Sequence, residues 1–370
     1  MSIKSDLKFN TSIHGARGLF CVFVVLYHIW NSGLPRWPVP EILNQIFGSF
    51  RYGVELFFAI SGFVIHVTMQ PVLNGSATPL QFILNRTTRI FPVLWVTVAL
   101  FLPLGILKGE SQITGYLEPF WLFIVSLAGN LLALGPIWPV PVFYGVTWSI
   151  GYEFVFYSLC FGHLLIHYYF NKNMSWLLIF VGILVVLAHP RAVFFLSGLI
   201  VGHLREYNQL KQTAKNFPLL WLVLFLFSWH WLAAEKSPFF INMFFWNFSF
   251  QWPLGILAFV AMTKCIFGIA DGKGNFCRFL NLSILQWLGT ISYSLYLWHL
   301  IILGILKFAL LKFGVVAVSG GWSQFILALF GFPSSVAIAH VSYIVLKQKF
   351  THWLRKNLRF QFTWPASETR

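Results

Sequence analysis

Residues 15–30 read GARGLFCVFVVLYHIW, an apolar run that contains two basic side chains, Arg17 and His28. A run of this length and hydropathy is typical of a helix that crosses a lipid bilayer, which needs about 20 mostly apolar residues. Comparable runs recur along the whole chain, separated by Pro, Gly or charged residues. The pattern predicts an all-α fold, a polytopic bundle of transmembrane helices.

The composition extends this interpretation to the whole chain of 370 residues. Hydrophobic residues make up 58% of it and charged residues 9%, with a mean hydropathy of +0.74. Because a typical soluble domain carries about 25% charged residues, an ordinary soluble protein is excluded. The formal net charge of +15 would favour a nucleic-acid partner in a soluble domain. In a chain this apolar we expect lipid contacts and no nucleic acid, with the basic loops orienting the helices.

Loop charge also predicts the number of membrane crossings. Of eleven apolar segments, the two centred near Phe180 and Leu199 are short and are separated by a break at Pro190. If residues 176–204 cross once, most of the basic loop residues face the cytoplasm, as the positive-inside rule requires. We therefore expect about ten membrane-spanning helices with both termini cytoplasmic, in the cell inner (cytoplasmic) membrane. Without repeats or low-complexity runs, residues 1–370 are expected to form one integral-membrane domain with no soluble appendage.

The pair Arg17 and His28 is the first candidate site. A charged side chain at the centre of a membrane helix costs about 2.5 to 3.5 kcal/mol on insertion scales, which makes each one a functional candidate. The two residues are eleven positions apart, so they project from nearly the same stripe of a helix, about 16 Å apart along its axis. They can line one groove for a long, thin cofactor arm with a phosphate at one end. Taken singly, His28 could be a packing histidine and Arg17 an interfacial anchor.

Two arginines before the third apolar run form the second candidate site. Arg86 and Arg89 are three residues apart, so on a helix they share a face and could hold a polyanion with two planar guanidinium groups. Together with Arg17 they would form a phosphate clamp. The alternative is an anchor that obeys the positive-inside rule.

A carboxylate amid aromatic residues is the third candidate. Glu153, in TWSIGYEFVFY (147–157), needs a partner to stay charged in such surroundings. His28 or an arginine could serve, and a His with an orienting acid would make a general base. A structural ion pair is the alternative. Ser149 could bind a ligand or its own backbone carbonyl.

The remaining polar residues carry weaker signals. Glu55 is expected near the outer end of the second helix, solvated or paired with Arg51, and Ser61 is read as a helix-packing residue. His163 and His167 have a helical i, i+4 spacing that could hold a metal, but near an aqueous end they are expected to be interfacial. The four cysteines match no metal pattern and are expected to be free thiols, so we predict no metal site.

Five segments in order resemble a known family. They are IHGARGLFCVFVVLYH (13–28), GVELFFAISGFVI (53–65), RTTRIFP (86–92), WSIGYEFVFY (148–157) and LGTISYSLYLWH (288–299). Together they resemble the membrane-bound acyltransferase family 3, whose members O-acylate sugars and other hydroxyl acceptors. The chain departs from the family pattern at His14, where many members carry an acid, and at Gln348 to Phe350. We expect no periplasmic hydrolase-like extension of the kind that members often carry.

The resemblance implies roles for individual residues. It makes His28 essential to transfer and places Arg86 and Arg89 against acyl-CoA at the cytoplasmic side. The remaining positions that match family motifs, expected to bind substrate, are Glu55, Trp148, Ser149, Tyr293 and His299.

We therefore expect an enzyme that moves an acyl group, expected to be acetyl, from cytosolic acyl-CoA (acetyl-CoA) to a sugar hydroxyl of a surface polysaccharide or its lipid-linked precursor. Arg17, Arg86 and Arg89 would hold the nucleotide, and one continuous passage would lead from them to His28. His28 would be the general base and Glu153 its orienting or charge-balancing acid. Alternatively, His28 carries the acyl group covalently, in which case labelled protein would accumulate without acceptor. The alternative function is that of a transporter of a lipid-linked sugar or anionic metabolite, which would also need charged side chains around a cavity.

Overall fold

The structure is a computed structural model in which every regular element is a helix within the ranges that it describes. This confirms the predicted all-α class for that part of the chain. The described residues are 10–107, 119–134, 141–170, 182–186, 190–206, 217–234 and 252–350, with single residues at 109, 113, 115, 117 and 180.

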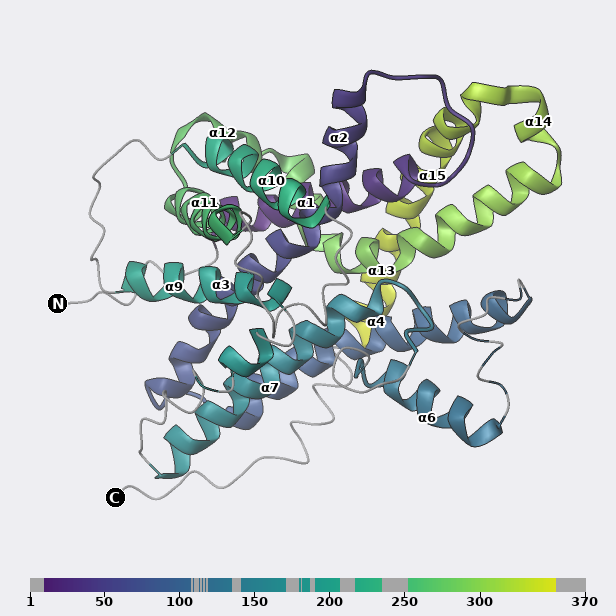
Figure 1. The fold of residues 1–370 in the computed structure, drawn as a ribbon. Helices are drawn as coiled ribbons and strands as arrows, with labels where there is room; N and C mark the ends of the chain where they lie inside the picture. The colour runs from purple at the N-terminus through teal and green to yellow at the C-terminus, as the bar shows by residue number, and fades with distance from the viewer. Residues whose placement is uncertain are drawn as a thin grey trace.

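Figure 1 shows the order and arrangement of the helices. The α-helices are α1 (Thr11–Trp30), α2 (Glu41–Ser49), α3 (Gly53–Leu73), α4 (Pro79–Leu107), α6 (Phe120–Leu131), α7 (Thr147–Phe170), α9 (Val193–Glu206), α10 (Pro218–Ala234), α11 (Trp252–Asp271), α12 (Gly274–Leu280), α13 (Ser283–Lys312), α14 (Val315–Ser319) and α15 (Ser323–Ser342). The 3-10 segments are η1 (Phe50–Tyr52), η2 (Pro190–Ala192) and η3 (Gly320–Trp322), and η4 (Tyr343–Phe350) is π-helical.

Seven helical segments of the described chain are long and apolar enough to cross a membrane. Two further apolar helices, Phe120–Leu131 and Pro218–Trp231, are shorter. The expected total of about ten crossings and the cytoplasmic location of both termini stay predictions, because residues 1–9, 351–370 and part of 176–204 lie outside the described residues. The seven segments are Thr11–Trp30, Glu41–Leu73, Pro79–Leu107, Thr147–Phe170, Pro253–Asp271, Ser283–Lys312 and Val315–Phe350.

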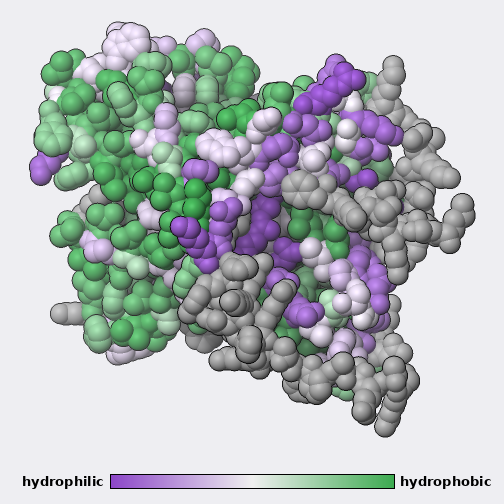
Figure 2. Space-filling view, turned by 180° about the vertical axis from the view of Figure 1, so that it is seen from behind, coloured by the Kyte–Doolittle hydropathy of each residue, from purple (hydrophilic) through white to green (hydrophobic). Residues whose placement is uncertain are grey.

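The outer surface fits a lipid environment. Large apolar side chains are exposed over much of it, including Leu107, Phe313 and Val318. Figure 2 shows broad hydrophobic areas, whereas hydrophilic residues gather in one part of that face. Exposed apolar area of this extent is costly in water and favourable against lipid chains. The four cysteines are buried and free, as expected.

Glycines bring two pairs of helices into backbone contact. Helix α1 packs along α13, and a Cβ on Gly289 would overlap the backbone carbonyl of His14. Helix α3 packs along α9 in the same way, because a Cβ on Gly198 would overlap the carbonyl of Ala59. Small residues at such crossings let membrane helices approach closely and gain dispersion contacts. The first crossing therefore fixes α1 against α13, and the second fixes α3 against α9.

We predict that Gly198→Ala destabilises the protein by about 1–3 kcal/mol, because the added methyl meets a backbone carbonyl that cannot rotate away. Thermal unfolding of the detergent-purified protein measures the effect. Gly162→Ala is the matched control, since a Cβ on this α7 glycine meets nothing within 4 Å. Equal melting temperatures for the two variants would contradict the role given to this crossing.

Candidate functional site

A small cavity lies where α1, α3, α4, α7 and α13 converge. Each of these helices contributes one of the five segments singled out in the sequence. Side chains that are scattered over nearly 280 positions of the sequence therefore face one space. The lining residues are Arg17, Val54, Phe57, Phe58, Ser61, Arg89, Ile90, Ser149, Ile150, Glu153, Tyr157, Ser292, Tyr293 and Tyr296.

Three charged side chains face this cavity. Arg17 comes from α1, Arg89 from α4 and Glu153 from α7. Arg17 lies within electrostatic range of both other charges. Two guanidinium groups against one carboxylate leave the cavity with an excess of positive charge, which suits an anionic group such as a phosphate.

Glu153 is held by hydroxyl groups. Its Oε1 accepts hydrogen bonds from Ser61 Oγ at 3.0 Å and from the Tyr157 hydroxyl. Ser61, expected only to pack helices, is thus also a donor in the cavity. Tyr157 was not singled out from the sequence, although its position four residues after Glu153 places it on the same helix face.

Hydroxyl groups also line the part of the cavity formed by α7 and α13. Ser149 Oγ lies 2.7 Å from the Tyr296 hydroxyl and 3.1 Å from the carbonyl oxygen of Val146. The hydroxyl of Tyr293 donates to the carbonyl oxygen of Ile90 at 2.8 Å. Ser149 therefore bonds a carbonyl oxygen of its own backbone and still lines the cavity. The backbone bond does not remove its hydroxyl from the cavity wall.

Arg86 occupies a different environment from Arg89. It is 6% exposed, is absent from the cavity lining and donates to Thr68 Oγ1. Its guanidinium carbon lies 5.6 Å from the ring centroid of Tyr157. The two arginines are three residues apart but have different positions. Arg89 faces the cavity, as Arg17 does. Arg86 lies behind Tyr157 and packs against the cavity wall.

His28 lies beyond the other end of the cavity, beside a second histidine. Its ring centroid is 5.1 Å from that of His299, and His299 is 5.9 Å from Tyr296. Tyr296 lines the cavity, whereas His28 and His299 are not among its lining residues. In the described structure His28 therefore lies outside the space that Arg17 lines, and Tyr296 contacts both that space and the ring of His299.

The expected pairing of His28 with Glu153 is not formed among the described residues. Glu153 binds Ser61 and Tyr157, while the ring neighbours of His28 are Tyr27 and His299. The reason is spacing along α1, because Glu153 lies near Arg17, eleven residues from His28. His299 occupies the position next to His28 that was expected for the acid.

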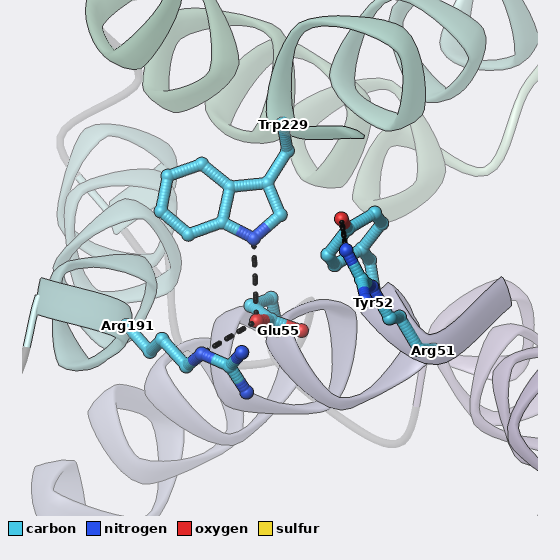
Figure 3. A network of polar contacts seen from close by, with 5 residues as sticks. All are labelled: Arg51, Tyr52, Glu55, Arg191 and Trp229. Carbon is cyan, nitrogen blue, oxygen red and sulfur yellow. Dashed lines mark hydrogen bonds and ion pairs between the residues drawn. The ribbon is translucent and has the colours of Figure 1, made fainter. Parts of the chain in front are cut away.

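Glu55 belongs to a second polar cluster, drawn in Figure 3. The expectation that it is solvated is wrong, because its exposure is 0%. Its Oε1 accepts from Trp229 Nε1 at 3.2 Å and lies 3.5 Å from Arg191 Nε. Arg51, the partner expected from the sequence, donates instead to the Tyr52 hydroxyl at 2.5 Å.

Trp148 connects this cluster to the wall of the cavity. The guanidinium carbon of Arg191 lies 5.1 Å from the Trp148 ring centroid, and Trp148 also contacts the ring of Phe58, which lines the cavity. Glu55 and Trp148 are therefore outside the cavity lining. Nothing in the local sequence pointed to Arg191 and Trp229 as partners, since they lie more than 130 positions away.

A metal site finds no support in the described part of the chain, where no group of three or more His, Cys, Asp or Glu side chains could hold an ion. His163 and His167 share α7 at its end away from Ser149.

Comparisons with known proteins identify relatives of this chain by sequence. A family model described as "Acyltransferase domain" matches residues 10–344. The chain is 26% identical to the exopolysaccharide production protein ExoZ of Rhizobium meliloti (strain 1021), over 72% of this chain and 80% of that one. It is 24% identical to the peptidoglycan O-acetyltransferase OatA of Listeria monocytogenes serovar 1/2a, over 79% of this chain and 49% of that one.

The chain thus spans about half the length of the Listeria protein. A shorter similarity, 32% identity over 120 residues, relates it to nodulation protein 10 of Rhizobium leguminosarum bv. viciae, over 28% of this chain and 30% of that one. No solved structure matches the chain.

We predict that Arg86→Ala destabilises the protein, whereas Arg89→Ala leaves its stability unchanged or raises it. Arg86 loses a buried charged hydrogen bond to Thr68, a loss of about 1.5–3 kcal/mol. Removing Arg89 relieves its repulsion with Arg17. Thermal unfolding in one detergent compares the two variants, and a lower melting temperature for Arg89→Ala would contradict the assignment.

Proposed function

The chain belongs to the acyltransferase domain family, and on that premise we propose that it transfers an acetyl group from cytosolic acetyl-CoA to a sugar hydroxyl of a surface polysaccharide or of its lipid-linked precursor. The acetyl group and the polymer are supported by similarity to a peptidoglycan O-acetyltransferase and an exopolysaccharide production protein. One structural observation carries the proposal: the cationic cavity built from all five family-like segments.

The donor fits the charged part of the cavity. Acyl-CoA carries phosphates at one end of a long arm and the thioester at the other. Arg17 and Arg89 face the same space and supply planar, fixed cations of the kind that bind phosphate oxygens. Arg86 contributes indirectly, because its guanidinium group packs on Tyr157, which donates to Glu153.

The thioester would follow α1 towards His28. The separation of Arg17 and His28 along the helix is about 16 Å, which suits the arm of acyl-CoA. Tyr296 stands between the cavity and the histidines, held by its contact with Ser149. Rotation of Tyr296 away from Ser149 when the donor binds would open the passage.

His28 supplies the base in this proposal. It takes the proton of the acceptor hydroxyl while the hydroxyl oxygen bonds to the thioester carbon. The carbon–sulfur bond then breaks, and the proton passes from His28 to the CoA thiolate. A positioned general base of this kind is worth about 10²- to 10⁴-fold in rate. Glu153, beside Arg17, balances the positive charge of the donor site.

The proposed location is the cell inner (cytoplasmic) membrane, with both termini in the cytosol and the donor entering from that side. Its support is the excess of basic residues in the loops expected to face inwards. Glu55 and Trp148, outside the cavity lining, are proposed to act on the acceptor through the Arg191 cluster.

We predict that His28→Ala abolishes acetyl transfer by the detergent-purified protein while leaving its thermal stability within about 1 kcal/mol of wild type. Release of CoA and labelling of a polysaccharide acceptor measure the reaction. His167→Ala, at the far end of α7, is the control and should keep full activity. Activity of His28→Ala would remove the proposed base. Wild-type transfer in detergent, where no sealed compartment exists, also sets the transporter alternative aside.

We predict that Arg89→Ala raises the KM for acetyl-CoA on the order of 10-fold, because a charged hydrogen bond to phosphate is worth about 1.5–3 kcal/mol. The KM for the acceptor should change less than about 2-fold, because Arg89 contacts the donor and not the acceptor in this proposal. Lys312→Ala, which removes an exposed cation at the end of α13, is the control. Equal increases in both KM values would argue against a phosphate site at Arg89.

A further inference from the structure

His299 has a fixed tautomer in the centre of the bundle. Its exposure is 0%, and its Nδ1 lies 3.2 Å from the carbonyl oxygen of Leu295, one turn earlier on α13. A carbonyl oxygen only accepts hydrogen bonds, so Nδ1 carries the proton and donates it. In the neutral ring Nε2 is then an unprotonated acceptor.

That acceptor has no hydrogen-bond partner among the described residues, although it is buried. An unsatisfied buried polar atom costs about 1–3 kcal/mol, so one that persists calls for a physical account. The neighbouring imidazole is His28, from α1, with its ring centroid 5.1 Å away and its plane tilted by 46°. At that separation a small rotation of His28 brings a ring N–H to His299 Nε2.

We propose that His299 is the positioning residue for His28, accepting a hydrogen bond on Nε2 from one nitrogen of the His28 ring. This rests on the proposed function, in which His28 is the base. The bond leaves the other nitrogen of His28 unprotonated and directs it away from His299. His299 thereby does what the sequence predicted for Glu153, whose Oε1 is held by Ser61 and Tyr157.

The proton balance is simple. The free nitrogen of His28 takes the acceptor's hydroxyl proton as the new ester bond forms and the carbon–sulfur bond breaks. The imidazolium then has two N–H groups, one of which stays bonded to His299. The other returns its proton to the CoA thiolate. His299 keeps its Nδ1 proton on Leu295 throughout and carries no net charge.

A neutral orienting group suits this place in the molecule. A carboxylate next to a neutral His28 would be an unpaired charge in the interior of a membrane bundle, where such a charge is costly. A histidine fixed by a main-chain carbonyl supplies an acceptor without that charge. Its backbone anchor on α13 also lies within the pair of helices, α1 and α13, that glycines hold in close contact.

The test compares two substitutions of His299. In His299→Asn the side-chain amide can still donate to Leu295, but nothing reaches the position of Nε2. In His299→Gln the longer side chain can place an oxygen near that position. We expect kcat to fall on the order of 100-fold in His299→Asn and to recover at least partly in His299→Gln, with both KM values within 2-fold of wild type.

Equal kcat values in the two variants, at the wild-type level or below it, would overturn the proposal, because only Gln restores an acceptor. A change confined to KM would overturn it too. His28→Ala, assayed alongside, separates the two levels of inference. If it is inactive while His299→Asn is fully active, only the role of His299 fails, whereas an active His28→Ala removes the proposed function itself.

If neither variant folds, nitrogen NMR of wild-type protein labelled with ¹⁵N-histidine decides the question. The proposal requires His299 in the Nδ1-protonated tautomer with a hydrogen-bonded Nε2, and loss of that Nε2 hydrogen-bond shift in His28→Ala. The opposite tautomer, or a His299 signal unaffected by His28→Ala, would overturn it. His167→Ala again serves as the control for unspecific shifts.

Discussion

Hydrocarbon cannot solvate charge, and the arrangement of this molecule depends on that constraint. Each charged side chain within the helices must find its partners inside the bundle. Arg17, Arg89 and Glu153 do so by facing one cavity, and Arg86 does so by inserting against Thr68 and the ring of Tyr157. The cost of burying these groups is offset only where helices from distant parts of the chain converge. The cavity is the place where that convergence occurs.

Helix α3 separates two polar regions with different designs. One face of α3 contributes Ser61, Phe57 and Phe58 to the cavity. Glu55, on the same helix, is bound to Arg191 and Trp229 instead. The cavity has spare positive charge and several hydroxyl groups, whereas the Glu55 cluster joins a fully buried carboxylate to a half-exposed guanidinium group. The cavity therefore suits an anion. The Glu55 cluster instead connects α3 to η2 and α10.

The two ends of the α1 stripe serve different purposes. Arg17 belongs to the cationic end, together with side chains from α4 and α7. His28 belongs to the imidazole end, together with α13. Tyr296 lies between the two and contacts both Ser149 in the cavity wall and the ring of His299. Backbone contact at glycines restricts the motion of α1 against α13. The changes that can occur between Arg17 and His28 are therefore side-chain rotations.

The sequence by itself determined the helical membrane class, the segments that carry the site and most of its polar residues. Hydropathy and helical spacing are local properties, so they can be read along the chain. Only the tertiary structure decided the partners on other helices: Ser61 for Glu153, Arg191 and Trp229 for Glu55, and the ring contact of His299 with His28. Spacing placed Arg86 and Arg89 on one face, yet a helix face is wide enough to divide them between a cavity and a packed interface. Pairing between helices depends on crossing points set by close backbone packing, and those join residues 92 or more positions apart, which no local period records.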